Sequence, residues 1–524
     1  MKRSQSVDSQ CDRKRLSLCR AGQILGLVLS FAAVVYAQNP APKSTLDELL
    51  DALHTNGSLT QQQYDALKQS IAAKPETQAP APHAVPSSEA PAKLVTAMDN
   101  AVGFHSGPFD VTFSGEINGF YVHDRADRTH GGCVLCLAST GARPNSSVRN
   151  GLLPGDLSVK IATKQNGYDI AVFFGIWPGI ESLLTGGLAG TTFGGVNLAP
   201  GNPTGFGVAG IDFRQQYLTV GKANMGTFKV GRDLGFLGQE AILNDFTLLG
   251  AGSTNGNVGP GSVTLGRIGL GYIYTDFMPQ ISWTSPSAGG LQFAAGMFAP
   301  LSDVVSTTLG FNGNPNNSGG AIFSAPLTGH GQPQFQTKLT YTVPTKGSVK
   351  AKVWSNFLTQ SMEANSADSV DPFLTIPVGS NVRAWGVDYG LKFSAGAADF
   401  VATGYNGSGI GTEGLLFLAT SPAGSKRDSQ GYYVQGTYTF AKKFTLGASY
   451  GQSHLSLASG EIGSPFQAES LAITRNNGSW VGQGRYAMTK WVNLVGEYTH
   501  TRSESQAGGI STSDSIAIGT IAFF

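Results

Sequence analysis

The sequence predicts an all-β fold, a 16-stranded antiparallel transmembrane β-barrel with a short N-terminal helical hairpin. Three observations predict it: the composition, the regular alternation of connection lengths and an apolar C-terminal strand. Charged residues make up 13% of the chain and glycine contributes 70 residues, about half and about twice the usual shares. The mean hydropathy is -0.04, so apolar residues are interleaved with small and polar ones. This composition is typical of a sheet with one lipid-facing side and one wet side.

The second observation is that short and long connections alternate. From Phe109 onward, segments of about ten residues alternate apolar and polar side chains. Short connections lie near 166–167, 222–225, 287–289, 344–347, 394–396, 441–442 and 488–490, and connections of roughly twelve to forty residues lie between them. Outer-membrane barrels have tight periplasmic turns, longer outer loops and an even strand number. The predicted strands are 109–122, 155–164, 168–177, 211–221, 226–232, 276–285, 290–298, 333–342, 348–357, 382–393, 397–406, 430–440, 443–452, 477–487, 491–501 and 514–524.

The third observation is the C-terminal strand, residues 515–524, which is apolar and ends on Phe524. It fits a strand that closes a membrane barrel, with its last aromatic ring at the interface. From these ten residues alone, an edge strand of a soluble β-protein is the alternative. Aromatic residues near the predicted strand ends fit interfacial girdles, and they are Trp177, Tyr217, Trp354, Trp385, Tyr486, Trp491 and Tyr498.

The N-terminal part divides into three predicted segments before the barrel of residues 109–524. Residues 1–37 have the basic start, apolar stretch and small-residue cleavage site of a signal peptide. Residues 38–74 contain two short helices between positions 44 and 72, and 75–108 form a Pro/Ala-rich linker. The helices are either a small surface hairpin or a module that binds a periplasmic partner, because two short helices cannot bury their leucines alone.

Cleavage of the signal peptide would leave two cysteines, Cys133 and Cys136. In an exported protein a C-x-x-C pair predicts a local disulfide. A redox motif would need a thioredoxin-like setting, and a zinc site would need two further ligands. Neither is visible nearby, so no metal or other cofactor is predicted.

Several stretches resemble Gram-negative outer-membrane porins of sixteen strands, and the order of segments is most similar to DcaP-like porins. They are residues 113–120, 213–217, 226–232 and 278–284, and the resemblance covers roughly 109–524. It implies a homotrimer in the outer membrane of a Gram-negative bacterium, in contact with its lipid, and small dicarboxylates as solutes. It also implies that the third long loop, here 233–275 with Asp233, Glu240 and Asp245, folds inward to narrow the channel.

The alternation of the strands assigns a basic lumen wall. A barrel of sixteen strands is too wide for side chains to fill, so it encloses an aqueous channel whose selectivity is electrostatic. The acidic inward positions are Glu116, Asp156, Asp169, Asp388 and Glu497. The basic ones are Lys160, Lys164, Lys229, Lys338, Lys350, Lys352, Lys392 and Arg485, with Arg214 and Arg232 as further candidates. A basic wall opposite an acidic loop predicts a preference for small anions, unless these charges are solvated at turns and rims.

Other classes of function are weaker readings of the sequence. No H-E-x-x-H or Walker A motif is present, and no catalytic residue is predicted. Residues 205–210 match G-x-G-x-x-G, but a strand follows instead of a helix. A plugged transporter needs about 22 strands and a larger plug domain. The net charge of +1 carries no information about nucleic-acid binding, and no nucleic-acid partner is predicted. A structural or adhesive barrel tethered through the N-terminal helices is the remaining alternative.

Overall fold

The computed structural model describes residues 61, 65, 95–98, 101–128, 133–138, 144–180, 192–193, 196–197, 211–254, 263–302, 323–325, 327–345, 347–364 and 376–524. Residues 1–93 and 94–524 form separate units, and the second contains the barrel. The predicted signal peptide lies outside the described residues. So does the predicted hairpin except Gln61 and Asp65, which are both helical, and its binding role stays a prediction.

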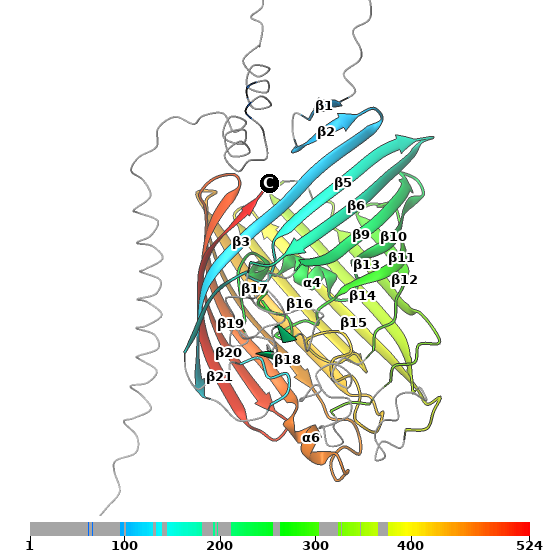
Figure 1. Cartoon of the computed structure of the whole chain (residues 1–524), viewed down its shortest axis with the longest axis vertical. Coiled ribbons are helices and arrows are strands. Elements are labelled where there is room, and N and C mark those ends of the chain that lie inside the picture. Colours follow the sequence, from blue (N-terminus) through cyan, green and yellow to red (C-terminus); the bar gives the residue numbers. More distant parts are fainter. Residues whose placement is uncertain are drawn as a thin grey trace, which may run out of the picture. The chain divides into compact units, whose positions relative to one another are not determined.

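Within these ranges, sixteen antiparallel strands form a closed barrel (Figure 1), as predicted. The last strand pairs with the first, from Thr512 opposite Arg128 to Phe523 opposite Glu116. The strands are β3 (Phe109–Arg128), β5 (Asp156–Gln165), β6 (Tyr168–Pro178), β9 (Ile211–Lys222), β10 (Gly226–Leu234), β11 (Phe277–Thr284), β12 (Leu291–Phe298), β13 (Gln334–Thr342), β14 (Val349–Glu363), β15 (Asn381–Ala395), β16 (Ala398–Ser408), β17 (Asp428–Phe440), β18 (Phe444–Leu455), β19 (Thr474–Ala487), β20 (Val492–Ser505) and β21 (Ile510–Phe523).

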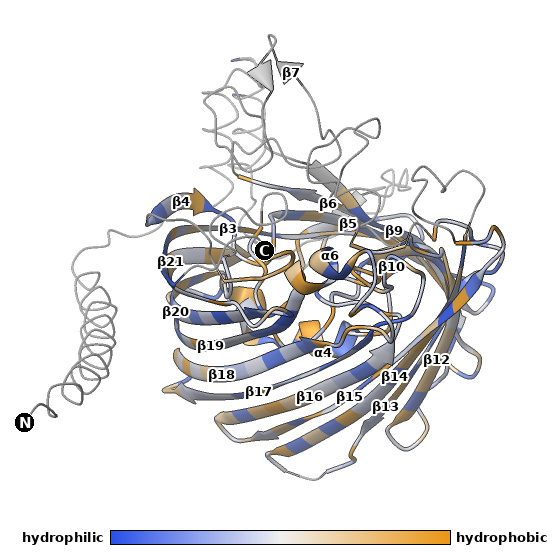
Figure 2. Cartoon of the chain, turned by 90° about the horizontal axis from the view of Figure 1, so that it is seen from below, coloured by the Kyte–Doolittle hydropathy of each residue, from blue (hydrophilic) through white to orange (hydrophobic). Residues whose placement is uncertain are grey.

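The two faces of the sheet differ in polarity, and Figure 2 shows apolar and polar residues alternating along the strands. On β13, Phe335 and Leu339 remain exposed on the outer face, whereas Gln336 between them is buried on the inner face. Because successive side chains of a strand point to opposite faces, this alternation gives one face to lipid and one to the lumen.

The predicted aromatic girdles are only partly correct. Trp385 and Trp491 lie on the outer face with 41% and 52% of their surface exposed, as expected. Tyr217 and Trp354 instead face the lumen, because their register partners Gly231 and Thr340 lie on lumen-facing positions. A shift of one residue moves a side chain to the other face of a sheet, so proximity to a strand end does not fix its side.

Several strands extend beyond their predicted ends on the long-loop side of the barrel. The connection between β20 and β21 covers only residues 506–509, so the predicted long connection there was wrong. Thr501 to Ser505 continue the ladder with β19, although they are all polar. Hydrophobic alternation ends where a strand leaves the apolar band, but backbone pairing continues past that point.

The predicted linker of residues 75–108 also needs correction at its end. β1 (Val95–Ala97) and β2 (Gly103–Ser106) form a hairpin, and β2 pairs with the start of β3. The first described strand of the unit 94–524 therefore begins at Val95, before the predicted barrel boundary. Outside the barrel ring, β4 (Asn145–Arg149) pairs with β3, and β7 (Thr192–Phe193) pairs with β8 (Val196–Asn197).

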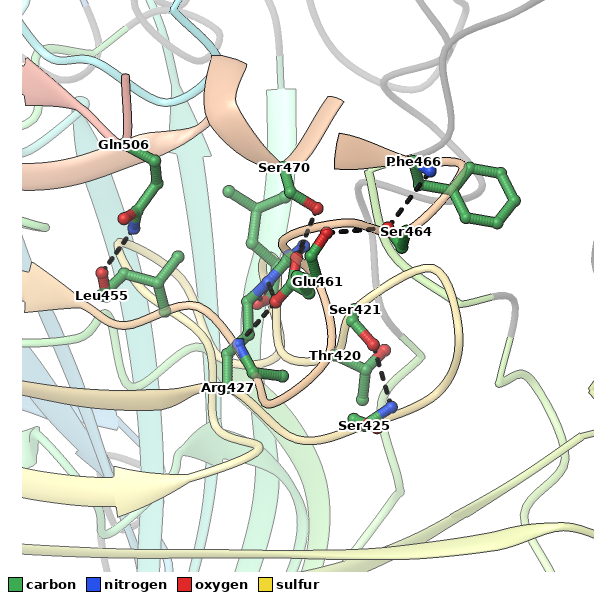
Figure 3. A network of polar contacts seen from close by, with 12 residues as sticks. Thr420, Ser421, Ser425, Arg427, Leu455, Glu461, Ser464, Phe466, Ser470 and Gln506 are labelled. Atoms are coloured by element: carbon green, nitrogen blue, oxygen red, sulfur yellow. Dashed lines mark hydrogen bonds and ion pairs between the residues drawn. The ribbon is translucent and has the colours of Figure 1, made fainter. Parts of the chain in front are cut away.

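The long loops pack on one another through a buried ion pair (Figure 3). The Arg427 guanidinium donates to both carboxylate oxygens of Glu461 at 2.9 and 2.7 Å, and the Ser470 hydroxyl donates to Glu461 at 2.5 Å. Ser470 belongs to α6 (Gln467–Ala472). Burial alone would raise the pKa of Glu461, but the bonds from Arg427 lower it below its usual value. The network therefore fixes α6 against the loop before β17.

The cysteine pair lies in the same group of loops. Cys133 and Cys136 are joined by a disulfide. Between them, the Val134 backbone N–H donates to the Ala472 carbonyl at 2.9 Å, and the Thr474 N–H donates to the Val134 carbonyl at 2.9 Å. The disulfide loop is thus attached to the segment that follows α6. Of the helices within the described residues, none has the length and apolar character needed to cross a membrane.

Candidate functional site

The described parts of the connection between β10 and β11, residues 235–254 and 263–276, run through the barrel interior, and we call them the inward loop. It carries α4 (Gln239–Asn244) and the 3-10 turn η1 (Phe246–Leu249). Figure 2 shows α4 inside the ring of strands. The Phe236 and Leu237 N–H groups donate to Gln336 Oε1 on β13 at 2.7 and 2.8 Å. The Gly238 N–H donates to Asp388 on β15 at 2.7 Å, so the loop is held against this wall.

The returning part of the inward loop is fixed on strands further along the barrel wall, β17 and β20. The Phe246 N–H donates to Gln435 on β17 at 2.8 Å. The N–H groups of Ala251 and Gly252 donate to the Glu497 carboxylate on β20. At Gly252, φ is +58° and an added Cβ would lie 2.4 Å from the Gly266 Cα. Only glycine fits there without displacing the loop backbone.

Lysines from two wall strands converge on α4. Lys338 of β13 and Lys352 of β14 donate to the two Glu240 carboxylate oxygens at 2.5 and 2.7 Å. Burial alone would raise the pKa of Glu240, but the two lysines lower it below its usual value. Lys392 of β15 is the register partner of Lys352. Two lysines therefore contact one carboxylate, and a third is paired with Lys352 across the strands, where like charges repel unless an anion compensates them.

A second ion pair lies where the inward loop leaves the wall. Lys229 and Asp233 lie four residues apart on the same face of β10 and form an ion pair. Gln215 of β9 also donates to Asp233 at 2.8 Å. Asp233 is buried, whereas Lys229 retains partial exposure. Both predicted residues therefore face the lumen, but their charges compensate each other.

Asp245 does not face the basic wall, contrary to expectation. Its side chain caps η1, accepting bonds from the Thr247 N–H at 2.9 Å and the Tyr272 hydroxyl at 3.0 Å. Burial raises the pKa of Asp245, although Arg267 and these bonds oppose the change. The loop carboxylate that meets the wall is Glu240, whereas Asp245 is part of the internal packing of the loop.

Four of the predicted cations have no acidic partner among the described residues. They are Lys160 on β5, Lys350 on β14, Lys392 on β15 and Arg485 on β19, and register places all four on the lumen face. Lys164 at the short-turn end is paired with Asp169 at 3.3 Å.

The two further arginine candidates do not join this wall. Arg232 occupies an outer position of β10, between the lumen-facing Gly231 and Asp233. The Arg214 guanidinium lies 5.7 Å from the Trp177 ring centroid and 5.8 Å from that of Phe277. A register shift between β6 and β9 at this point explains why the alternation did not assign Arg214.

The acidic wall positions are covered or paired. Glu497 and Asp388 hold the inward loop, as described above. Glu116 is the register partner of Asp156 on β5, and Glu116 is buried. Asp399 on β16 accepts a bond from Ser394 and lies at the short-turn rim. In the described ranges, no group of three or more His, Cys, Asp or Glu residues could hold a metal ion.

Sequence reasoning missed the neutral side chains that hold the inward loop. Gln336, Gln435 and Gln483 all occupy lumen-facing positions and bond to loop backbone or to its carboxylate anchor. Their position in the alternation was a usable signal, because glutamines whose side chains cannot reach bulk water need hydrogen-bond partners. The partner segment could not be assigned from alternation alone.

Comparisons with known proteins place this geometry in a family. The chain matches the Gram-negative porin family over residues 90–506. The outer membrane channel DcaP of Acinetobacter baumannii is 13% identical, with a TM-score of 0.51, over 82% of this chain and 99% of that one. An anion-selective porin from Comamonas acidovorans is 12% identical, with a TM-score of 0.47, over 79% and 100%. No curated protein sequence matches the chain. The family match extends over most of the chain and confirms the porin resemblance: this chain belongs to the Gram-negative porins, the channels of the outer membrane.

Proposed function

We propose that the barrel is a passive diffusion channel for small hydrophilic solutes, with a preference for anions such as carboxylates and dicarboxylates. One observation carries this proposal. Four cations of the lumen wall have no acidic partner among the described residues, namely Lys160, Lys350, Lys392 and Arg485, whereas the wall carboxylates Glu116, Asp388 and Glu497 are buried.

The carboxylates near the constriction do not cancel this excess. Asp233 is paired with Lys229, and Glu240 is shared between Lys338 and Lys352. Two lysines on one carboxylate leave one positive charge in excess. A cleft lined by one sign of charge raises the local concentration of the opposite ion. Anions should therefore enter more readily than cations of equal size.

Zero-current potentials across a planar bilayer with a KCl gradient test the proposal directly. Wild-type channels should give a zero-current potential whose sign shows that chloride is more permeant than potassium. The double variant K392E/R485E should shift it toward potassium, because it replaces two wall cations with carboxylates. Lys443→Gln, at the exposed turn between β17 and β18, is the matched control and should leave the potential unchanged. A potassium preference in the wild type would contradict the proposal, and no open-channel current would favour the structural barrel instead.

A homotrimer is the assembly we propose, as the family resemblance implies. The outer face near the seam carries small residues, including Gly119 on β3, Gly482 on β19 and Gly496 on β20. Nearer the connection between β20 and β21, on the same face, Asp514 accepts bonds from Tyr498 at 2.5 Å and His500 at 2.9 Å. Charged groups facing lipid are costly, and small residues allow close approach, so a second copy suits this face better than lipid.

Two glycines allow a matched test of the trimer. An added Cβ meets nothing within 4 Å at Gly482 near the seam or at Gly436 on the outer face of β17. Gly482→Trp should convert trimers to monomers in native electrophoresis and mass measurement. Gly436→Trp should leave the trimer intact. Loss of the trimer in both variants, or in neither, would contradict the assignment of this face.

A further inference from the structure

Two aromatic rings stack inside the lumen, on the wall before the inward loop leaves β10. Phe173 of β6 and Tyr217 of β9 are register partners on lumen positions. Their ring centroids are 5.1 Å apart, with an interplanar angle of 11°. The adjacent Phe174 is on the outer face, 41% exposed, where lipid covers it. Exposing apolar rings to an aqueous channel is unfavourable. Contact with lipid explains aromatic rings on the outer face, but it does not explain this pair.

The side chains around the two rings are small. On one side, the neighbouring lumen positions of β5 and β6 are Ala162 and Ala171. On the other side they are Ser158 and Gly175. At Gly231, the β10 partner of Tyr217, an added Cβ would lie 2.9 Å from the Tyr217 Cβ. The stacked rings therefore stand above a wall of small residues and form a platform, defined here as Phe173 and Tyr217.

Cations lie on both sides of this platform. The Lys229 ammonium is 4.7 Å from the Tyr217 ring centroid and is already paired with Asp233. On the other side, Lys160 is the register partner of Phe173. Lys160 is exposed and has no hydrogen-bond or ion-pair partner among the described residues. The positive charge on the Tyr217 side of the platform is thus compensated by Asp233. The positive charge of Lys160, on the Phe173 side, is not compensated by any described residue.

We propose that Lys160 and the platform form a lumen binding site for aromatic carboxylates. The ligand ring stacks on Phe173, and its carboxylate pairs with Lys160. Aromatic pairs contribute beyond the burial of their area, and a charge-assisted bond fixes the orientation. An aliphatic acid of equal charge lacks the stacking partner, and a neutral aromatic alcohol lacks the ion pair. The inference rests on the proposed anion channel, because the ligand reaches the site as an anion.

Saturation-transfer NMR on the full-length protein in detergent tests the site with four probes: benzoate, cyclohexanecarboxylate, acetate and benzyl alcohol. Benzoate should bind wild-type protein more tightly than the other three. Phe173→Leu keeps an apolar side chain without a ring, and it should weaken benzoate binding about three- to tenfold. Lys160→Gln should remove the preference for benzoate over benzyl alcohol. Phe174→Leu, one position away on the outer face, is the matched control and should bind benzoate like the wild type.

Several outcomes would overturn the site. Equal benzoate affinity of wild type and Phe173→Leu would show that the ring is not used. Equal affinity for benzoate and cyclohexanecarboxylate would show that stacking does not contribute. Equal affinity for benzoate and benzyl alcohol would show that the charge does not contribute. Zero-current potentials of the same preparations separate this inference from the proposed function. An anion-preferring channel that does not bind benzoate selectively would contradict only the proposed site. A cation-preferring channel that does bind benzoate selectively would contradict only the proposed anion preference.

Discussion

The carboxylates of the outgoing and returning parts of the inward loop have different surroundings. The outgoing part, residues 235–244, meets β13 and β14 through an ionised group, Glu240 between Lys338 and Lys352. The returning part, residues 245–276, is fixed by backbone N–H groups on Gln435 and Glu497, and its own Asp245 bonds within the loop. Backbone N–H groups therefore hold both parts, but of the carboxylates Glu240 and Asp245 only Glu240 of the outgoing part meets lysines of the wall.

This difference separates two properties that mutagenesis can change independently. The position of the loop sets the cross-section of the channel, and the balance between Glu240 and its lysines sets the local potential. Changes in the returning part should alter conductance with little effect on ionic sign. Changes at Glu240 should alter ionic sign with little effect on loop position, because Gln336 and Asp388 also hold that part of the loop.

The largest expected effect comes from Gly252→Val in the returning part. A left-handed conformation costs a residue with a Cβ about 1–2 kcal/mol. Overpacking against Gly266 adds about 1–3 kcal/mol. The loop should leave its anchor on Glu497, so single-channel conductance should rise and become noisy. Gly436→Val, where an added Cβ meets nothing within 4 Å, is the control. Unchanged conductance in Gly252→Val would show that this anchor does not position the loop.

Glu240→Gln is expected to have the next largest effect. It removes the carboxylate between Lys338 and Lys352 and keeps the side-chain shape. The anion-to-cation permeability ratio should rise roughly twofold or more, because the constriction gains one net positive charge. Asp110→Asn, an exposed residue near the start of β3, is the control for a general charge effect. A lower ratio in Glu240→Gln, measured by zero-current potentials, would contradict the assigned role.

The pH dependence of selectivity should be smaller and confined to acid. The lysines hold the pKa of Glu240 below its usual value of 4.5. The stabilising contact is complete above that value and is lost as the pH falls through the lower folded pKa. The part of the anion preference that Glu240 controls should thus stay constant from pH 7 to about 5 and rise at more acidic pH. The Glu240→Gln variant should therefore show a smaller rise in anion preference at acidic pH than the wild type. An identical rise in both proteins would show that other carboxylates cause it.

Asp245→Asn should have the smallest effect. The substituted amide keeps an oxygen that can cap η1, and Asp245 is buried within the loop, away from the lysines of the wall. Loop stability should fall by about 1 kcal/mol or less, as for a weakened cap. The permeability ratio should remain that of the wild type. A shift as large as that of Glu240→Gln would show that both parts of the loop carry the potential.

The barrel could be predicted because each strand repeats one local rule. Phe444, Leu446 and Tyr450 alternate with polar or small residues, and the same rule applies to every membrane-spanning strand. Closure against Phe109–Arg128 followed from an even strand number and an apolar last strand. The strand extensions beyond the membrane could not be found this way. At Thr501 to Ser505 both faces carry polar side chains, although Thr501, Ser503 and Ser505 are buried, so the hydrophobic period disappears.

The site could be predicted only where it depends on alternation. Register placed Lys338, Lys352 and Lys392 on one face, and that face was assigned from the sequence. Which loop carboxylate reaches them depends on contacts far apart in the chain. Gly238 with Asp388 and Ala251 with Glu497 are examples. Glu240 and Asp245 lie five residues apart in one loop, and only tertiary contacts distinguish them.

The central claim is that the lumen wall gives the channel its anion preference. The most direct measurement is the zero-current potential of wild-type and K392E/R485E channels in the same KCl gradient. The account predicts a chloride-selective potential for the wild type and a shift toward potassium for the double variant. Identical potentials for the two proteins, or a potassium-selective wild type, would contradict it.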